Sequence, residues 1–409
     1  MYNTIVHVLD VFPSRSETFI INHIIECERK GLKSIILVNT LHTIDKASQK
    51  NLINSYGLYD VAHCFNPKMP KHKVLRVLKA LGLLLNNLSN YKVFLNTLNQ
   101  QKYGLKAKTL KLWFQASVFL KYQKHEIFHG HFGVSGKVLA DMKDIGAIKG
   151  DIITSFYGYD TFSVEENRKE LQTYFKDVFK RSKLIVTSSN YLYANLLKLN
   201  APEHKLLVNA VGVDVSKFPY RKREYNSELH IVTVGRLIEL KGQAYGIDAV
   251  ILLLQKGYNI KYTIIGHGDD FEDIKTKIHH SGYQNHIHLK GSGTQAEIAE
   301  VLLQSHVFLM TSITDTLGRA EGQGLVIAEA QATGLPVVAF NSGGIGDSIT
   351  HNKTGYLVEE KNVKDMANSI EKFIDNLELI NDMGYAAKCF VEDRFNSQKQ
   401  SDKMIKQYK

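Results

Sequence analysis

Gly235, Arg236 and Lys241 are residue types suited to binding a phosphorylated ligand. They lie in the segment VGRLIELKG, directly after a β-branched run. Glycine lets the backbone turn close to a ligand, and the two cations supply the fixed positive charge that a diphosphate needs. By itself this pattern has low specificity, because an arginine and a lysine at this spacing are more often simply solvated.

A second and more specific pattern is EGQGLVIAEAQATGLPVVAFNSGG, residues 321–344. Gly322 and Gly324 predict a flexible turn that leads into a helix and then into a buried strand. The first backbone amides of a helix carry partial positive charge and favour phosphate. The segment therefore predicts an anion-binding position at Gly324, Leu325 and Val326.

Glu321 and Glu329 belong to the same segment, with seven residues between them. Glu329 falls one to two turns into the expected helix, where a carboxylate can accept hydrogen bonds from a ribose diol. Glu321 precedes the helix and can bind the hydroxyl groups of a sugar. A purely structural pair of acids is the alternative, but the flanking glycines and GLPVVA favour a binding role.

The elements around these residues predict an α/β protein. Short β-branched runs alternate with amphipathic helices, which indicates parallel sheets covered on both faces. The expected strands are 4–10, 34–40, 126–132, 151–158 and 183–189, then 229–235, 261–268, 286–291, 307–312 and 336–342. We expect two doubly wound, Rossmann-like domains facing a central cleft, because ligands bind beyond the carboxyl ends of such strands.

The length of 409 residues suggests two or three domains. We expect a first Rossmann-like domain over residues 1–212 and a second over residues 213–390. The connection falls within 209–228, which contains a proline and a charged stretch without periodicity. Residues 391–409 are expected to form a helix that packs back on the first domain.

The formal net charge of +10 comes from one segment. Residues 61–125 contain twelve Lys or Arg and no Asp or Glu, whereas the rest of the chain carries 39 basic and 41 acidic residues. Excess positive charge favours an anionic partner. No recognition-helix, RRM or zinc-finger pattern accompanies this charge, so nucleic acid is not expected.

The same segment is apolar, and we expect it to form a basic amphipathic insertion over residues 68–124. HKVLRVLKALGLLLNNL and LKAKTLKLWFQASVFLKY place leucines and the aromatic Trp113, Phe114 and Phe119 among basic residues. Such helices suit the headgroup region of an anionic bilayer. The alternative is that they pack into a core with solvated lysines outside.

The cysteines and the N-terminal residues favour a cytoplasmic location. Cys27, Cys64 and Cys389 form no CxxC pair, which argues against a disulfide framework or zinc site. Residues 1–19 lack the basic and apolar regions of a signal peptide, and no apolar run is long enough to span a membrane. We therefore expect a protein peripheral to the inner face of the plasma membrane.

VGRLIELKG together with EGQGLVIAEAQATGLPVVA resembles the retaining family-4 glycosyltransferases of GT-B fold. The resemblance extends to YTIIGHGDD and to residues 286–312, and so covers most of the second half. FPSRSETFI, HGHFG, SFYGYD and VGVD in the first half are similar to bacterial enzymes that build exopolysaccharide, capsule or lipopolysaccharide, including the colanic acid type.

This resemblance implies roles for individual residues. Arg236 and Lys241 contact the donor diphosphate, Glu329 contacts the ribose and Glu321 the transferred sugar. His131 matches the histidine of the first domain near the reacting centre. The donor-sugar set is Glu321, Gly322, Gln323 and Gly324, the catalytic set is His131, Glu321, Arg236 and Lys241, and backbone groups at Gly235, Gly266 and Gly291 complete the nucleotide site.

Several positions depart from the family pattern. Gln323 replaces the usual phenylalanine, which leaves the identity of the sugar open, and residues 313–320 lengthen the stretch before Glu321. The Gly-Gly loop of many members is absent. We expect the acceptor side at Ser16, Glu17, Thr18 and Asp160, although Ser14 and Glu17 also have the spacing of a helix cap.

His125, His129 and His131 are clustered, but no nearby acid or cysteine completes a set of metal ligands, so we expect no metal and no cofactor. His131 is either a cleft residue near the donor or a hydrogen-bonded core imidazole.

The sequence as a whole predicts transfer of a hexose-type sugar, with retention, from a UDP or GDP sugar to a saccharide or lipid-linked saccharide. The alternatives are a GT-B nucleotide-sugar epimerase or hydrolase and a non-catalytic membrane-surface binding protein.

Overall fold

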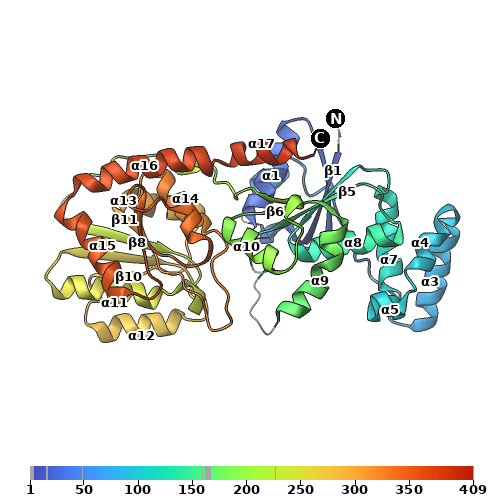
Figure 1. The fold of residues 1–409 in the computed structure, drawn as a ribbon, viewed down its shortest axis with the longest axis horizontal. Helices are drawn as coiled ribbons and strands as arrows, with labels where there is room; N and C mark the ends of the chain where they lie inside the picture. Colours follow the sequence, from blue (N-terminus) through green and yellow to red (C-terminus); the bar gives the residue numbers. More distant parts are fainter. Residues whose placement is uncertain are drawn as a thin grey trace.

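The computed structural model describes residues 4–14, 17–47, 49–158, 160–161, 167–225 and 227–408. Two parallel β-sheets, each covered by helices, lie side by side along the long axis of the molecule (Figure 1). The first sheet has the strand order β3-β2-β1-β4-β5-β6-β7 and the second has the order β10-β9-β8-β11-β12-β13. In both, the order reverses beside the first strand of the unit, as in doubly wound folds.

The first sheet contains seven strands. They are β1 (Thr4–Phe12), β2 (Lys33–Leu41), β3 (Ala62–Cys64), β4 (Ile127–His131), β5 (Asp151–Phe156), β6 (Ser182–Thr187) and β7 (Leu206–Val208). The α-helices of this half are α1 (Thr18–Arg29), α2 (Lys50–Ser55), α3 (Lys73–Leu85), α4 (Tyr91–Asn96), α5 (Gln100–Tyr103), α6 (Leu105–Lys108), α7 (Lys111–Phe119), α8 (Gly133–Ile145), α9 (Arg168–Arg181) and α10 (Asn190–Lys198).

The second sheet contains six strands. They are β8 (Leu229–Val234), β9 (Ile260–Ile265), β10 (Ile287–Leu289), β11 (Val307–Met310), β12 (Val337–Phe340) and β13 (Gly355–Val358). The α-helices of this half are α11 (Gln243–Gln255), α12 (Phe271–Ser281), α13 (Gln295–Gln304), α14 (Leu325–Ala332), α15 (Val363–Asp375), α16 (Glu378–Arg394) and α17 (Ser397–Lys406).

The last two helices connect the two halves. Helix α16 lies on α14 in the C-terminal half, and α17 continues across to α1 in the N-terminal half (Figure 1). A bridge between Val213 and Asn396 fixes this crossing beside the chain connection that runs from β7 to β8. Both chain segments that join the halves therefore lie together.

All ten strands expected from the sequence are present, and three further strands are not anticipated by it. The additional strands β3, β7 and β13 have three, three and four residues and lie at sheet edges. An edge strand is paired on one side and partly exposed, so it lacks the continuous apolar run that marks a central strand.

The insertion between β3 and β4 divides into two layers. Helices α4 and α7 pack towards α8 and the first sheet, and Phe119 is fully buried there. Helix α3 lies outside them, at the end of the molecule remote from the second sheet (Figure 1). None of the helices in the described part of the chain is long and apolar enough to cross a membrane.

Candidate active site

Three glycine loops lie together at the carboxyl edge of the second sheet. Gly235 follows β8, Gly266 follows β9 and Gly291 follows β10, and these strands are neighbours. The Gly235 amide donates to the Ile265 carbonyl at 3.0 Å, and the Gly266 amide donates to the Gly291 carbonyl at 2.8 Å. A Cβ at Gly266 would lie 1.8 Å from the Gly235 carbonyl oxygen, so only glycine fits there.

Lys241 and Glu321 are brought together at this edge. The Lys241 ammonium, in a 3-10 turn after β8, donates to Oε2 of Glu321, which lies in the loop before α14. Both side chains are only 16% exposed. The pair joins two residues that the sequence assigned to neighbouring parts of one ligand, the diphosphate and the transferred sugar.

Arg236 differs from Lys241 in its surroundings. It is exposed at the carboxyl end of β8, and its side chain makes no ion pair with any residue that the structure describes. Its own carbonyl accepts a hydrogen bond of 2.8 Å from Gln243, which fixes the backbone while the guanidinium stays accessible. A guanidinium in this state is available to an anionic ligand.

Residues 313–320, which lengthen the stretch before Glu321, form an ordered turn around Asp315. Oδ1 of Asp315 accepts from the amides of Leu317 and Arg319 at 3.0 and 2.8 Å, and Oδ2 accepts from the Arg319 guanidinium at 2.7 Å. Thr316 is tied to Glu239 in the Arg236–Lys241 loop at 3.0–3.1 Å. The extra residues therefore brace the loop that carries Lys241.

Helix α14 begins directly after Gly324, whose φ of +77° is in the left-handed region. This conformation turns the chain from the Glu321 loop into the helix. The amides of Leu325 and Val326 belong to its first turn, where helix geometry provides no acceptor. The structure thus brings the expected anion-binding amides next to the Lys241–Glu321 pair.

Glu329 lies in α14 and is half-buried. Its carboxyl makes no hydrogen bond to the residues that the structure describes, and burial raises its pKa to about 7, although Lys217 opposes this shift. A carboxylate in this state can accept hydrogen bonds from a ligand. Lys217 was not anticipated from the sequence as part of this site.

The Glu321–Gly324 loop faces the N-terminal half. Oγ of Ser189 donates to the Gly322 carbonyl at 2.6 Å, and a Cβ at Gly322 would lie 2.6 Å from the Tyr157 carbonyl oxygen. Asn190 adds a second contact, because its backbone amide and its side chain both donate to Asp347 at 2.6 and 3.0 Å. The expected donor-sugar residues therefore lie at the junction of the two halves.

Gln323 contacts the connection between the two sheets, and its expected role beside the donor sugar stays a prediction. Its side chain is buried and exchanges two hydrogen bonds of 2.8 Å with the amide and carbonyl of Val211. Val211 lies in the connection between the sheets, so Gln323 ties the sugar loop to that connection. In this conformation its polar side-chain atoms are not directed at a donor sugar.

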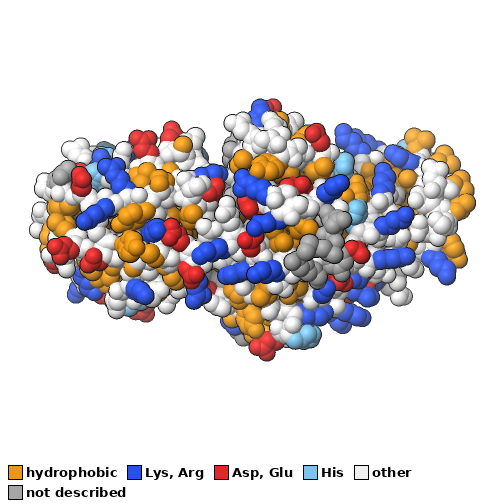
Figure 2. Space-filling model, turned by 90° about the horizontal axis from the view of Figure 1, so that it is seen from above, with side chains coloured by type: hydrophobic (Ala, Val, Ile, Leu, Met, Phe, Trp, Pro, Cys, Tyr) orange, Lys and Arg blue, Asp and Glu red, His pale blue; other side chains and the backbone are white. Residues whose placement is uncertain are grey.

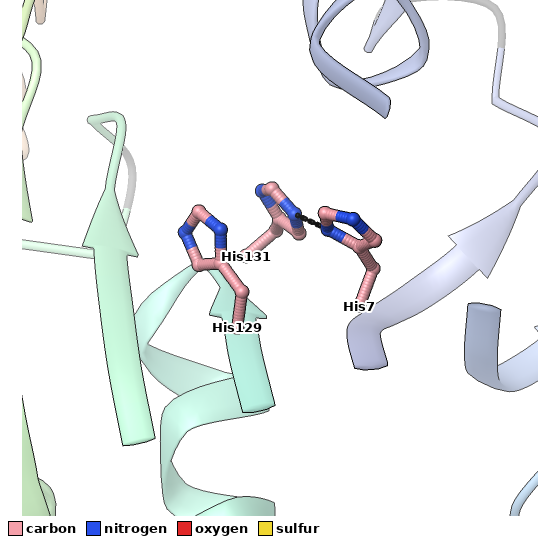
Figure 3. Close-up of side chains that lie close together, drawn as sticks. All are labelled: His7, His129 and His131. Atoms are coloured by element: carbon pink, nitrogen blue, oxygen red, sulfur yellow. Dashed lines mark hydrogen bonds between the residues drawn. The ribbon is translucent and has the colours of Figure 1, made fainter. Parts of the chain in front are cut away.

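His131 lies in a row of buried histidines on one face of the first sheet. Register places His7 of β1 beside His129 of β4, and His131 follows two residues later on the same face. Nδ1 of His7 lies 3.1 Å from Nε2 of His131 (Figure 3). Nδ1 of His131 lies 2.9 Å from the Tyr157 hydroxyl. Of the two alternatives for His131, the structure matches the hydrogen-bonded core imidazole, and a catalytic role stays a prediction.

Tyr408, which follows helix α17, completes this histidine layer. The Tyr408 hydroxyl lies 2.7 Å from Nε2 of His23 and 2.6 Å from Nδ1 of His129, whose Nε2 lies 2.8 Å from Ser155. Burial lowers the pKa of His23 to about 4. It also holds the pKa of His7, His129 and His131 well below the usual range, so the layer is neutral at pH 7.

A metal ion could approach His7, His129 and His131, since ligand atoms of these three lie within 4.8 Å of one another. Most of the ring nitrogens are already engaged in hydrogen bonds to each other or to hydroxyl groups. Nε2 of His7 is the buried ring nitrogen without a partner among the described residues. His7 and His23 were missed in the sequence, where His7 is one polar residue inside an apolar run and His23 follows Asn22 inside another.

The expected acceptor side is only partly described. Ser16 lies outside the described residues, and Thr18 begins α1. Glu17 occupies the N-cap position, but its side chain makes no capping hydrogen bond, and burial together with Asp10 raises its pKa to about 7. The Glu17 side chain therefore does not cap α1, and its acceptor role stays a prediction.

Asp160 organises the backbone near this edge. It is buried, and its carboxylate accepts from the Gly133 amide at the start of α8 at 2.5 Å and from the Gly158 amide at 3.4 Å. Burial raises its pKa to about 6 even though these amides favour the charged form. Its contacts position the 157–158 backbone that faces Gly322.

Comparison with known families identifies the C-terminal half. Residues 215–390 match the family "Glycosyl transferases group 1". This range contains both charged loops, all of the second sheet and helix α14.

Similar proteins extend over almost the whole chain. The amylovoran biosynthesis glycosyltransferase AmsK of Erwinia amylovora is 28% identical over 389 residues, covering 94% of each chain. The putative colanic acid biosynthesis glycosyltransferase WcaL of Escherichia coli is 28% identical over 395 residues, covering 95% of each. Among solved structures, Anabaena Alr3699/HepE in complex with UDP superposes with a TM-score of 0.73 at 14% identity, covering 99% of each chain.

The structural likeness confirms the predicted α/β fold of two doubly wound units, and the family match confirms the predicted class of enzyme. The chain is a glycosyltransferase of GT-B fold, and its residues 215–390 form a domain of the glycosyl transferases group 1 family.

Proposed function

We propose that the protein transfers a hexose-type sugar from a UDP or GDP sugar to a saccharide acceptor during synthesis of a bacterial surface polysaccharide. The observation that carries this proposal is the position of Glu321. It pairs with Lys241 at the carboxyl edge of the second sheet and lies in the loop that faces Tyr157 and Gly158 of the other half. A sugar held there would be in reach of both halves of the molecule.

The charge arrangement supports a diphosphate donor. Breaking the bond between sugar and phosphate places negative charge on the leaving diphosphate. Arg236, Lys241 and the first amides of α14 lie around one edge, where such groups can stabilise the developing charge. Glu329 would accept hydrogen bonds from the ribose, since its carboxyl has no partner among the described residues.

Retention of anomeric configuration is part of the proposal and follows the resemblance to family 4. No side chain is assigned as a nucleophile. The contact of Gly322 with Ser189 indicates how the two halves can close on the donor and exclude water that would hydrolyse it.

The printed names of similar proteins support the pathway. AmsK and WcaL are named for amylovoran and colanic acid biosynthesis, and HepE was solved with UDP-glucose as well as with UDP. We infer a saccharide acceptor from these names. We also infer that it is lipid-linked and that the enzyme works peripherally on the cytoplasmic face of the membrane, because residues 61–125 concentrate positive charge.

A donor panel tests the proposal. UDP, GDP and ADP sugars are compared for the shift in thermal unfolding that each produces, since a ligand of the native state raises its stability. The Arg236→Ala and Glu329→Ala variants should lose this shift, while Glu300→Ala on the exposed face of α13 should keep it. Nucleotide binding by Arg236→Ala and Glu329→Ala equal to the wild type would contradict the assignment.

Product analysis separates the reactions. The donor is incubated with and without a saccharide acceptor, and the anomeric configuration of the product is read by NMR. A transferase forms a glycoside only with acceptor present, whereas an epimerase or hydrolase consumes the donor without it.

A further inference from the structure

Exposed apolar side chains are concentrated in one short part of the chain. Of nineteen large hydrophobic residues that are exposed among the described residues, eleven lie between 74 and 105. The other eight are scattered over the rest of the molecule. Figure 2 shows the concentration as hydrophobic side chains gathered at the end of the molecule beside Lys and Arg. A patch of this kind on a protein surface marks an interaction site.

Helix α3 is apolar on two opposite faces. Its inner face packs on the aromatic cluster of the insertion through Ala80, Leu83 and Leu84. The Trp113 indole donates to the Ala80 carbonyl at 3.1 Å and fixes the helix in place. The contacts of the inner face therefore hold α3 in place. They do not explain why the outer face of the helix is also apolar.

The outer face carries a row of four aliphatic residues that we call the apolar ridge: Val74, Leu78, Leu81 and Leu85. Their spacing of three to four residues places them along one side of α3. Val74 is 61% exposed, Leu78 58% and Leu85 66%. Helix α3 has 13 residues, too few to cross a bilayer but sufficient to lie in its interface.

The exposed apolar surface continues beyond α3. It includes Leu88 in the turn that follows, Tyr91 and Leu95 of α4, and Leu98 and Leu105 further along the chain. The ridge is thus part of a larger apolar surface.

Basic residues surround this surface. Lys71, Lys73, Lys79 and Lys92 are exposed and form no ion pair with the described residues, whereas Lys102 and Lys106 pair with Asp144 and Asp141. Residues 61–125 contain no acid that could neutralise the others. Aliphatic side chains framed by unpaired lysines complement the acyl chains and headgroups of an anionic bilayer.

The same charges argue against other occupants. A second copy of the chain would bring the same basic surface into contact with this one, and like charges repel. Single-stranded nucleic acid is held by several exposed aromatic side chains, and among the large exposed hydrophobic residues of this surface only Tyr91 is aromatic. Trp113, Phe114 and Phe119 of the insertion are instead buried at 6% exposure or less, which corrects the expectation that they face a membrane.

We propose that the apolar ridge of α3, with the exposed leucines that follow it, inserts into the interfacial region of an anionic membrane as a monotopic anchor. The contact is hydrophobic as well as electrostatic. The anchor itself does not depend on the proposed function. Only its purpose does, which is to hold the enzyme at the membrane where a lipid-linked acceptor is found.

Vesicle flotation tests the anchor. The full chain is mixed with phosphatidylcholine vesicles containing about one-third phosphatidylglycerol, at low salt and at about 1 M salt, where charge attraction is screened. Leu78→Gln with Leu85→Gln should lower the partition coefficient about tenfold for each leucine withdrawn from lipid. The control, Leu197→Gln with Leu252→Gln, changes two exposed leucines of α10 and α11 and should bind like the wild type.

Fluorescence reports the depth of insertion. Trp113 is the single tryptophan of the chain and is buried, so it provides a constant background. In Leu81→Trp, the added indole should shift its emission to the blue on vesicles and be quenched by brominated acyl chains. Wild-type binding that persists in part at high salt supports the same conclusion.

Several results would overturn the anchor. They are vesicle binding by Leu78→Gln/Leu85→Gln equal to the wild type, an added tryptophan that acyl-chain bromine does not quench, and binding that salt abolishes completely. A wild-type dimer that these substitutions dissociate, with no vesicle binding, would assign the surface to a second copy.

The membrane anchor and the proposed function can be contradicted independently of each other. Leu78→Gln/Leu85→Gln should keep the thermal shift with nucleotide sugars, because the substitutions lie on α3 and not at the second sheet. Vesicle binding without any nucleotide-sugar binding would contradict the proposed function alone. Nucleotide-sugar binding without vesicle insertion would contradict the anchor alone.

Discussion

The ammonium of Lys241 donates a hydrogen bond to the carboxylate of Glu321, and each side chain is 16% exposed. The two residues are 80 positions apart in the sequence and come from loops after neighbouring strands of the second sheet. Each therefore neutralises the other before a donor arrives. An incoming diphosphate must either share the Lys241 ammonium with Glu321 or displace the Glu321 carboxylate from it.

Glu321→Gln is expected to bind UDP or GDP about two- to fivefold more tightly than the wild type. The substitution frees Lys241 from an ion pair worth about 1 kcal/mol or less, so the lysine can turn to the diphosphate. Isothermal titration with the nucleotide alone measures the change, and Glu300→Gln serves as a control. Weaker binding by Glu321→Gln would show that Glu321 holds Lys241 in its binding position.

Lys241→Met is expected to lower kcat by about 10²–10³, the usual effect of removing one group that stabilises charge in the transition state. KM for the acceptor should change little, because Lys241 lies on the donor side. Initial rates at saturating donor measure this, with Lys256→Met on the far side of α11 as the control. A higher KM for the donor with an unchanged kcat would assign Lys241 to binding of the donor in the ground state.

Glu329 is expected to couple nucleotide binding to proton release. Its pKa is raised to about 7 by burial, so near pH 7 the free protein holds it partly protonated. Hydrogen bonds from ribose hydroxyls favour the charged carboxylate and thus expel the proton on binding. Calorimetry in two buffers with different ionisation enthalpies should give a release of up to about half a proton at pH 7.

The control for this coupling is Glu329→Gln, which should bind nucleotide without proton release. Release that is unchanged in Glu329→Gln would assign the proton to another group.

His23→Gln is expected to weaken the dependence of the free energy of unfolding on pH in the acidic range. The folded protein holds the pKa of His23 at about 4, against 6.5 in the unfolded chain. Between pH 4 and 6.5 only the unfolded chain binds the proton. The contribution of neutral His23 to the free energy of unfolding is therefore complete above pH 6.5 and declines as the pH falls towards 4. Urea unfolding at several pH values between 4 and 6.5 gives the free energy of unfolding as a function of pH. The slope of this dependence should be lower by about 1.4 kcal/mol per pH unit in His23→Gln than in the wild type. Equal slopes for the two proteins would contradict a neutral, buried His23.

Tyr408→Phe is expected to lower the free energy of unfolding by about 1–3 kcal/mol. The hydroxyl joins His23 and His129, and removal leaves polar atoms of this buried layer without a partner. Tyr385→Phe, at a tyrosine that is 57% exposed, should change stability by about 0.5 kcal/mol or less. Similar losses in the two variants would show that the Tyr408 hydroxyl contributes nothing specific.

Local patterns predicted much of the C-terminal half. The placement of Gly235 after a strand and of Glu329 inside a helix depends on residues within about ten positions, where periodicity and glycine spacing are informative. The parallel arrangement then follows, because carboxyl ends of parallel strands share one edge. The order of the strands and the edge strands β3, β7 and β13 do not follow from such patterns.

Charge and hydrophobicity were readable from the sequence, whereas burial was not. The two apolar helical stretches of the insertion look alike as sequences. Packing covers Trp113 and Phe119 and leaves Leu78 and Leu85 exposed, since Leu78 and Leu85 lie on the face of α3 that points away from the inner layer.

The sequence by itself determined the class of enzyme, the two α/β units and the local setting of the residues that are expected to bind the diphosphate and the ribose. Only the tertiary structure decided which side chains meet across the chain. It pairs Lys241 with Glu321, turns Gln323 to Val211 and buries His131 between His7 and Tyr157. The physical reason is that these contacts join residues between 26 and 124 positions apart, so they depend on strand order and helix packing, which local propensity does not encode.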